Sequence, residues 1–169
     1  MLSTFDRALI RVNRWIVIAI LAAMASMVFA NVALRFFTDR SILWVEEVSR
    51  YLMIWLTFLG AGLVLRYGGH IGIDTLQERC PGIASGIRVA IFVVMLVFFA
   101  VMLLLGIRYA TFTWGQTTPV LQIPIGAVYL AMPIGFALMI VHALLMAIPY
   151  VRSRQVLANA EFDADAVKL

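Results

Sequence analysis

The chain has 169 residues, of which 64% are hydrophobic and 13% are charged, and its formal net charge is +4. Soluble domains average about 25% charged and about 45–50% apolar residues, so this composition excludes a soluble globular protein and indicates a small integral membrane protein. A positive net charge would suggest nucleic acid as the partner of a soluble protein. Here the arginines lie between apolar segments, where membrane topology explains them better, and we expect membrane lipid and no nucleic acid as a partner.

Four apolar segments are long enough to cross a membrane, because a hydrocarbon core about 30 Å thick needs about 20 helical residues. These segments cover residues 15–37, 45–65, 87–109 and 124–150. Between the second and third segments we expect a short stretch that lies at the membrane interface, and after the fourth a tail over residues 151–169. The sequence therefore predicts one all-α membrane domain over residues 1–169, with four transmembrane helices.

The first segment has to be distinguished from a secretory signal. Basic residues precede it, and Ala23-Met24-Ala25 matches the small-x-small pattern of a cleavage site. The apolar run continues to Phe37, so we expect a retained span.

The distribution of basic residues predicts the orientation. If the N-terminus is inside, nine Lys and Arg residues lie on the cytoplasmic side and three lie on the opposite side. The positive-inside rule then places both termini in the cytoplasm. The nine are Arg7, Arg11, Arg14, Arg66, Arg79, Arg88, Arg152, Arg154 and Lys168, and the three are Arg35, Arg40 and Arg108.

The second segment carries charges within its first two turns. Glu46 and Glu47 lie four and three residues before Arg50, so one guanidinium can serve both carboxylates. A charge inside a span costs about 2.5–3.5 kcal/mol at the helix centre on insertion scales and normally needs a partner. We therefore predict a structural polar network within the membrane domain or at its interface, whose members are Asn31, Arg35, Glu46, Glu47 and Arg50. The alternative is a charge cluster that snorkels into the lipid headgroups.

Helical spacing divides the second segment into two faces. At about 100° per residue, Glu46, Arg50, Met53, Thr57 and Gly60 fall within one sector. Trp44, Val48, Tyr51 and Trp55 fall on the opposite side, which we expect to contact lipid or a partner. In the fourth segment, Pro133 is expected to kink the helix, and Gly126 and Gly135 are expected to allow close packing.

No residue pattern in the chain indicates catalysis. The sequence has no nucleophile elbow, no His-Glu-x-x-His, no paired cysteines and no nucleotide-binding loop. We expect no catalytic, substrate-binding or metal-binding residue and no cofactor, and we expect His142 to be packed or hydrogen-bonded. Two alternatives stay open: a small redox or quinone-associated membrane anchor, with one haem between His70 and His142, and an oligomeric channel.

An ordered set of short motifs carries a resemblance to a known family. It comprises Asn31-Val32 with Arg35, Trp44-x-Glu46-Glu47-x-x-Arg50-Tyr51-x-x-x-Trp55, Phe58-Leu59-Gly60-Ala61, Gly69-His70-Ile71-x-Ile73-Asp74, and Pro124, Tyr129 and Pro133-x-Gly135. This set, inside a chain with four spans, resembles the DctQ-like small membrane subunit of TRAP transporters, the tripartite ATP-independent periplasmic transporters. The resemblance covers about residues 15–150.

The resemblance implies a non-catalytic subunit of a bacterial inner-membrane complex. Its partners would be a large permease subunit and a periplasmic binding protein that delivers an organic acid, such as a dicarboxylate or a sugar acid. Uptake would be driven by sodium bound in the large subunit. The residues that we expect at the interface with a partner or with lipid are Trp44, Tyr51, Trp55, Gly60, His70, Asp74, Tyr129 and Pro133.

Overall fold

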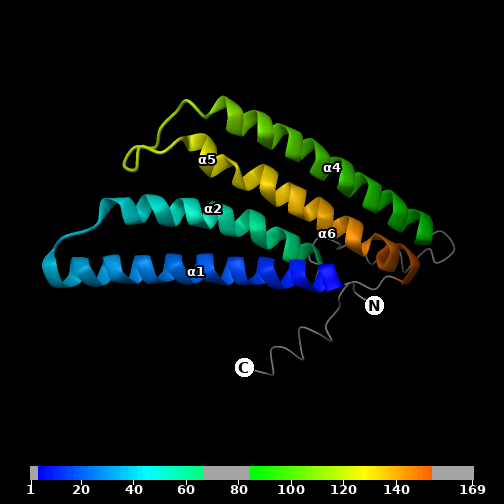
Figure 1. The fold of residues 1–169 in the computed structure, drawn as a ribbon, viewed down its shortest axis with the longest axis horizontal. Coiled ribbons are helices and arrows are strands. Elements are labelled where there is room, and N and C mark those ends of the chain that lie inside the picture. The colour runs from blue at the N-terminus through cyan, green and yellow to red at the C-terminus, as the bar shows by residue number, and fades with distance from the viewer. Residues whose placement is uncertain (1–3, 67–83, 154–169) are drawn as a thin grey trace, which may run out of the picture.

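The computed structural model describes residues 4–66 and 84–153, and both ranges are almost entirely helical (Figure 1). The helices are α1 (Thr4–Thr38), α2 (Leu43–Arg66), α4 (Ala84–Phe112), α5 (Ile125–Tyr129) and α6 (Ala131–Ser153). Four helical stretches are long and apolar enough to cross a membrane, one of them formed by α5 and α6 together. The predicted all-α fold with four spans is therefore confirmed for the described residues. The expected interfacial segment falls largely on residues 67–83, outside the described ranges.

The first helix begins well before the apolar segment that defines the first predicted span. Residues 4–14 contain no proline or glycine, so nothing interrupts the helix between Thr4 and Trp15. With 35 residues at about 1.5 Å each, α1 is about 52 Å long, more than the roughly 30 Å of a hydrocarbon core. Its first turns therefore have room to extend beyond the hydrocarbon, and this is where Asp6 lies.

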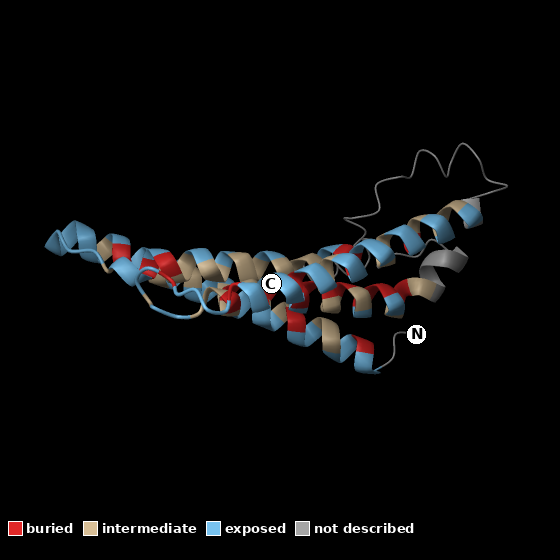
Figure 2. Ribbon diagram, turned by 90° about the horizontal axis from the view of Figure 1, so that it is seen from above, coloured by how far each residue is buried: buried red, intermediate tan, exposed pale blue. Residues whose placement is uncertain are grey.

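The helices lie side by side in the order α1, α2, α6, α4 (Figure 1). Helix α1 packs against α2, whereas α6 has α2 on one side and α4 on the other. An inner helix of the row is more buried than an edge helix. In the span that contains α6, 44% of the apolar window is buried, whereas in α1 the share is 6%. The buried residues of α1 are Asp6, Asn13 and Asn31, and buried positions are a minority along the whole ribbon in Figure 2. The described residues thus form a row of helices in which the edge helix α1 packs mainly against α2.

The core lies where α6 meets α2 and α4. It contains Leu65, Phe92, Phe99, Phe136, Met139, Ala143 and Met146. Helices α2 and α6 lie close together at Gly135, where an added Cβ would lie 2.6 Å from the Cβ of Phe58. At Gly126 an added Cβ would lie 2.4 Å from the carbonyl oxygen of Ala110. The expected close packing at both glycines is confirmed.

The hydrogen-bond ladder of the last span is interrupted next to Pro133, where we expected a kink, although Leu130 keeps helical backbone angles. Pro133 has no N–H to donate to the carbonyl of Tyr129, four residues earlier, and α5 ends at that residue. Helix α6 then starts at Ala131, and the Ile134 N–H bonds to the Leu130 carbonyl at 3.1 Å. The helix assignment is thus interrupted at Leu130, about one turn before Pro133. Pro133 is buried and fits against Gly106 of α4, where an added Cβ would lie 3.0 Å from the proline Cδ.

Candidate functional site

Glu47 fastens the connection between α4 and α5 to α2. Its Oε2 accepts a hydrogen bond from the backbone N–H of Val120 at 2.9 Å, and its Oε1 accepts one from the Tyr51 hydroxyl at 2.7 Å. Only 6% of Glu47 is exposed. A buried carboxylate is stabilised by such charge-assisted bonds, so Glu47 has partners without a basic residue. Sequence reasoning anticipated that this residue needs a partner, but assigned the role to an arginine.

The connection held by Glu47 is itself ordered by hydrogen bonds. The buried Thr118 donates its N–H to the carbonyl of Ile123 at 2.9 Å, and its hydroxyl accepts the N–H of Ile123 at 3.3 Å. Gln122 has a φ of 57°, the left-handed conformation that closes this turn. The loop is therefore a defined structure seated on the start of α2.

Asn31 closes the short connection between α1 and α2. Its Oδ1 accepts the backbone N–H of Ile42 at 2.7 Å, and the residue is only 9% exposed. Thus one member of the predicted polar network ties α1 to the residue just before α2, through a backbone group.

The other three members of the predicted network are exposed. Arg35 lies on the last turn of α1, and Glu46 and Arg50 lie on one side of α2. Within the described residues, no ion pair joins Arg50 to either glutamate. The structure therefore brings together Glu47 with Tyr51 and Asn31 with Ile42. A network that also includes Arg35, Glu46 and Arg50 stays a prediction.

The residues expected at an interface differ in their surroundings. Trp44 is 44% exposed, whereas Tyr51 and Trp55 are half-buried. Outside its own stretch of helix, Gly60 has no atom within 4 Å of the position that a Cβ would occupy, so this side of α2 is open.

The remaining interface candidates lie on α5 and α6 or outside the described ranges. Tyr129 packs edge-on against Tyr109 with ring centroids 4.7 Å apart, and Pro133 is covered by α4. The chain itself therefore provides packing partners for Tyr129 and Pro133. His70 and Asp74 fall outside the described residues.

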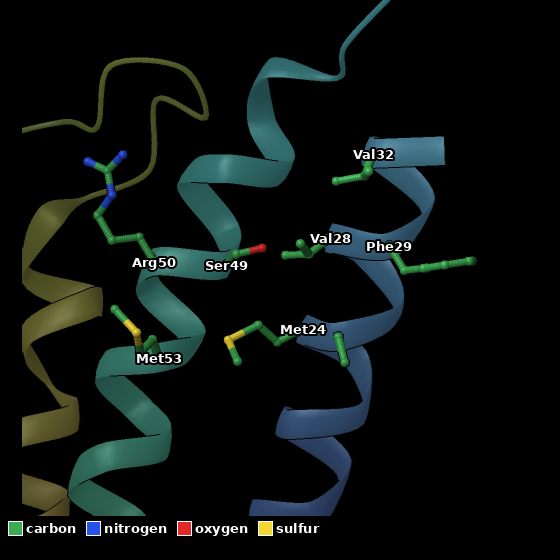
Figure 3. A pocket seen from close by; sticks show the side chains of 8 residues that line it. Met24, Val28, Phe29, Val32, Ser49, Arg50 and Met53 are labelled. Atoms are coloured by element: carbon green, nitrogen blue, oxygen red, sulfur yellow. The ribbon is translucent and has the colours of Figure 1, made fainter. Parts of the chain in front are cut away.

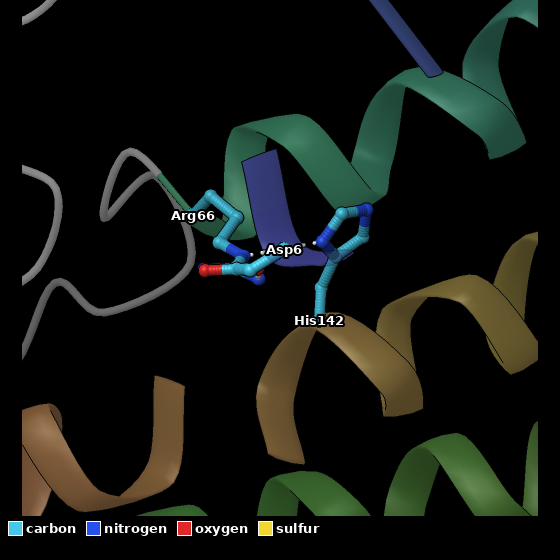
Figure 4. Close-up of polar contacts among 3 residues, drawn as sticks. All are labelled: Asp6, Arg66 and His142. Carbon is cyan, nitrogen blue, oxygen red and sulfur yellow. Dashed lines mark hydrogen bonds and ion pairs between the residues drawn. The ribbon is translucent and has the colours of Figure 1, made fainter. Parts of the chain in front are cut away.

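A second polar cluster, at the opposite end of α2, joins three helices (Figure 4). Arg66, the last residue of α2, donates Nη1 to Oδ2 of Asp6 at 3.1 Å and Nη2 to Oδ1 of the same carboxylate. Its Nε donates to Nδ1 of His142 on α6 at 3.1 Å. The exposed fractions are 2% for Arg66, 3% for Asp6 and 0% for His142. A bidentate arginine with a third acceptor is a strong, geometrically specific arrangement.

This cluster fixes the order of helices α1, α2 and α6. Asn13, about two turns after Asp6 on α1, donates a hydrogen bond from its Nδ2 to the carbonyl of Leu59 on α2 at 3.1 Å. The expectation that His142 is hydrogen-bonded is confirmed. The cluster itself was not predicted from the sequence, because Arg66 was used only as one of the basic residues that indicate the orientation in the membrane. The signal was present, since the predicted topology places Asp6, Arg66 and His142 at the same side of the membrane.

Two apolar grooves open beside α2. One, of about 600 Å³, lies between α1 and α2 and is lined by Met24, Ala25, Val28, Phe29, Val32, Ser49, Arg50 and Met53. Figure 3 shows Ser49 pointing toward Val28 of α1, whereas Arg50 and Phe29 point away from the space between the helices. The second groove, of about 710 Å³, is bounded by α2, α4 and α6, and its α2 residues are Thr57, Phe58 and Ala61.

Comparison of the sequence with known proteins identifies the family of this chain. The family model of the DctQ component of tripartite ATP-independent periplasmic transporters matches residues 24–152. The chain is 29% identical over 161 residues to the ectoine TRAP transporter small permease protein TeaB of Halomonas elongata, covering 92% of this chain and 82% of that protein. It is 43% identical over 70 residues to a putative TRAP transporter small permease protein of Haemophilus influenzae, covering 41% of this chain and 44% of that protein.

A third relative is much longer than this chain. The isethionate TRAP transporter permease protein DctMQ of Oleidesulfovibrio alaskensis is 31% identical over 104 residues, which are 60% of this chain and 16% of that protein. The family match extends from within α1 to near the end of α6 and includes the Glu47 connection and both grooves. This multi-pass membrane protein therefore belongs to the DctQ family, the small permease subunits of TRAP transporters.

Proposed function

We propose that this chain is a non-catalytic scaffold that holds a large permease subunit in the bacterial inner membrane, with both of its own termini in the cytoplasm. In the complete transporter, a periplasmic binding protein delivers an organic acid, such as a dicarboxylate or a sugar acid, to the large subunit. The large subunit moves the acid inward with sodium. The small subunit itself binds neither the acid nor the sodium.

The observation that carries this proposal is the open row of helices. A transport site is normally enclosed between helices, often where helices are interrupted near the membrane midplane. In the described residues, two cavities of about 600 and 710 Å³ are apolar grooves beside α2, and α1 packs mainly against one neighbour. Such a chain presents long apolar faces to its surroundings, as expected of a subunit that packs against a larger membrane protein.

The relatives support the same division of labour. In the DctMQ protein of Oleidesulfovibrio alaskensis, the region similar to this chain makes up 16% of the length, so a small-subunit region there is joined to a larger permease part. Two relatives are named for different compounds, ectoine and isethionate. The same kind of small subunit thus serves different transporters, which fits a scaffold better than a substrate-binding subunit.

The proposal is tested by purifying the tagged chain from its native membranes in a mild detergent and identifying its partners by mass spectrometry. We expect a stoichiometric TRAP large permease subunit. Proteoliposomes with both subunits and the binding protein should then take up one compound from a panel of dicarboxylates and sugar acids only under an inward sodium gradient. A chain that purifies alone would overturn the proposal. Copurifying haem or dehydrogenase subunits would support the redox-anchor alternative.

A further inference from the structure

After Leu43 and Trp44, which are exposed in the first turn of α2, the exposed positions of this helix recur at alternating spacings of four and three. Glu46, Arg50, Met53, Thr57 and Val64 are exposed, and Gly60 between them has nothing within 4 Å of its missing Cβ. This alternation marks the line along which one helix packs against another in a left-handed pair. We call these six residues the α2 seam.

Within the described residues, the seam is left free because α2 uses other sides for its neighbours. Toward α1, the carbonyl of Leu59 accepts the side chain of Asn13, and toward α6, Phe58 lies against Gly135. The two grooves open on either side of the seam, since Arg50 and Met53 line one and Thr57 lines the other. The seam is therefore a ridge between two apolar grooves, a shape into which side chains of a further helix can interdigitate.

The charges on the seam favour a protein over lipid as the occupant. Glu46 and Arg50 lie within the first two turns of a span, where exposure to hydrocarbon is costly. An anionic lipid phosphate that approached Arg50 would also meet Glu46 as a like charge. A protein surface can offer one acidic and one basic group in register. In the α1–α2 groove, Ser49 adds a buried hydroxyl without a hydrogen-bond partner among the described residues.

We propose that a transmembrane helix of the large permease subunit packs along the α2 seam. An acidic group of that helix meets Arg50, a basic group meets Glu46, and the small residues Thr57 and Gly60 allow the backbones to approach. This inference rests on the proposed function and adds to it the surface on which the large subunit docks.

Site-specific photocrosslinking in the native complex tests the position of the seam. A benzophenone amino acid replaces Met53 on the seam, Trp55 on the other side of α2, or Phe29 on α1, which is 76% exposed and points away from α2. We expect the Met53 position to crosslink to the large subunit and the other two to give at least about tenfold less of that product. Crosslinks to the large subunit mainly from Trp55 or Phe29, or to lipid alone from Met53, would overturn the inference while the proposed function stands.

Two variants test the contacts. Gly60→Leu adds a side chain where the isolated chain has open space, so the purified subunit should keep its melting temperature but retain at least about tenfold less large subunit. The exchange variant Glu46→Arg/Arg50→Glu should lose the large subunit to a similar degree. Normal retention of the large subunit by both variants would overturn the inference. If the unmodified chain retains no large subunit, the proposed function fails as well.

Discussion

The buried cluster of Asp6, Arg66 and His142 offers the sharpest test of how the helices are held together. Replacing Arg66 by Met keeps an apolar stem but removes all three hydrogen bonds that its guanidinium donates. The Asp6 carboxylate, 3% exposed, then loses its ion pair with Arg66, and the fully buried His142 loses the donor to its Nδ1. Removing one partner of a buried ion pair typically costs about 3–5 kcal/mol.

The lower end of that range applies here, because α1 is long enough for Asp6 to lie near the edge of the membrane, where water can reach an opened cluster. We therefore expect Arg66→Met to cost about 3 kcal/mol. At about 2–4 °C per kcal/mol for a chain of this size, the melting temperature falls by about 6–12 °C. It is measured in detergent by fluorescence-detected size-exclusion chromatography after heating. The matched control is Arg7→Met, since Arg7 is exposed on the same turn of α1 as Asp6, and its expected change is within about 0.5 kcal/mol.

A double-mutant cycle separates the ion pair from general loss of packing. Replacing both charges, as Asp6→Leu with Arg66→Met, removes both members of the buried ion pair together and should recover most of the stability lost by Arg66→Met alone. We expect a coupling free energy of at least about 1.5 kcal/mol between the two positions. A cost below about 1 kcal/mol for Arg66→Met, or additivity within about 0.5 kcal/mol, would refute the reasoning that this cluster holds α1 on α2 and α6.

Three further perturbations address other contacts. Glu47→Ala removes the acceptor of the Val120 N–H, so deuterium exchange at that amide should rise at least about tenfold, while Glu46→Ala should leave it unchanged; equal exchange in both variants would contradict the role of Glu47. Gly135→Val forces a Cβ against Phe58 and should lower stability by about 1–3 kcal/mol, measured as above, whereas Gly60→Val should change it little; the reverse order would contradict the packing. Asn31→Ala leaves the Ile42 N–H without its acceptor and should cost about 1–2 kcal/mol, and no change in melting temperature would argue against that bond.

The parts of this fold that depend on hydrophobic length could be predicted from the sequence, because a span needs only a sufficient apolar run. The same holds for the break near Pro133, which follows from its missing N–H, and for the close approach at Gly135. These are local properties of the chain. The helix continued outside the apolar segment in α1, since helix propensity without proline or glycine extends beyond the point where hydrophobicity ends.

The partners of buried polar groups could not be predicted, because they depend on which helices become neighbours. Arg50 lies within one turn of Glu47 in sequence, yet the carboxylate bonds with Tyr51 and with a backbone N–H 73 residues away. Likewise, Arg66 bonds to Asp6 and His142, which are 60 and 76 residues distant. Spacing along one helix indicates which side chains share a face. The order of the helices in the row decides what each face meets.

The two polar clusters act on opposite ends of the same helix. Glu47 ties the start of α2 to the connection before α5, and Arg66 ties its last turn to α1 and α6. Both clusters lie on sides of α2 that face the rest of the chain. Their charged side chains are hydrogen-bonded within the chain and need no external partner. Glu46 and Arg50 are the charges on α2 left outside these clusters, and both are exposed on the seam. A helix that is fixed at both ends and exposed along one side between them loses little conformational entropy when another helix docks on that side, which is the property a scaffold requires.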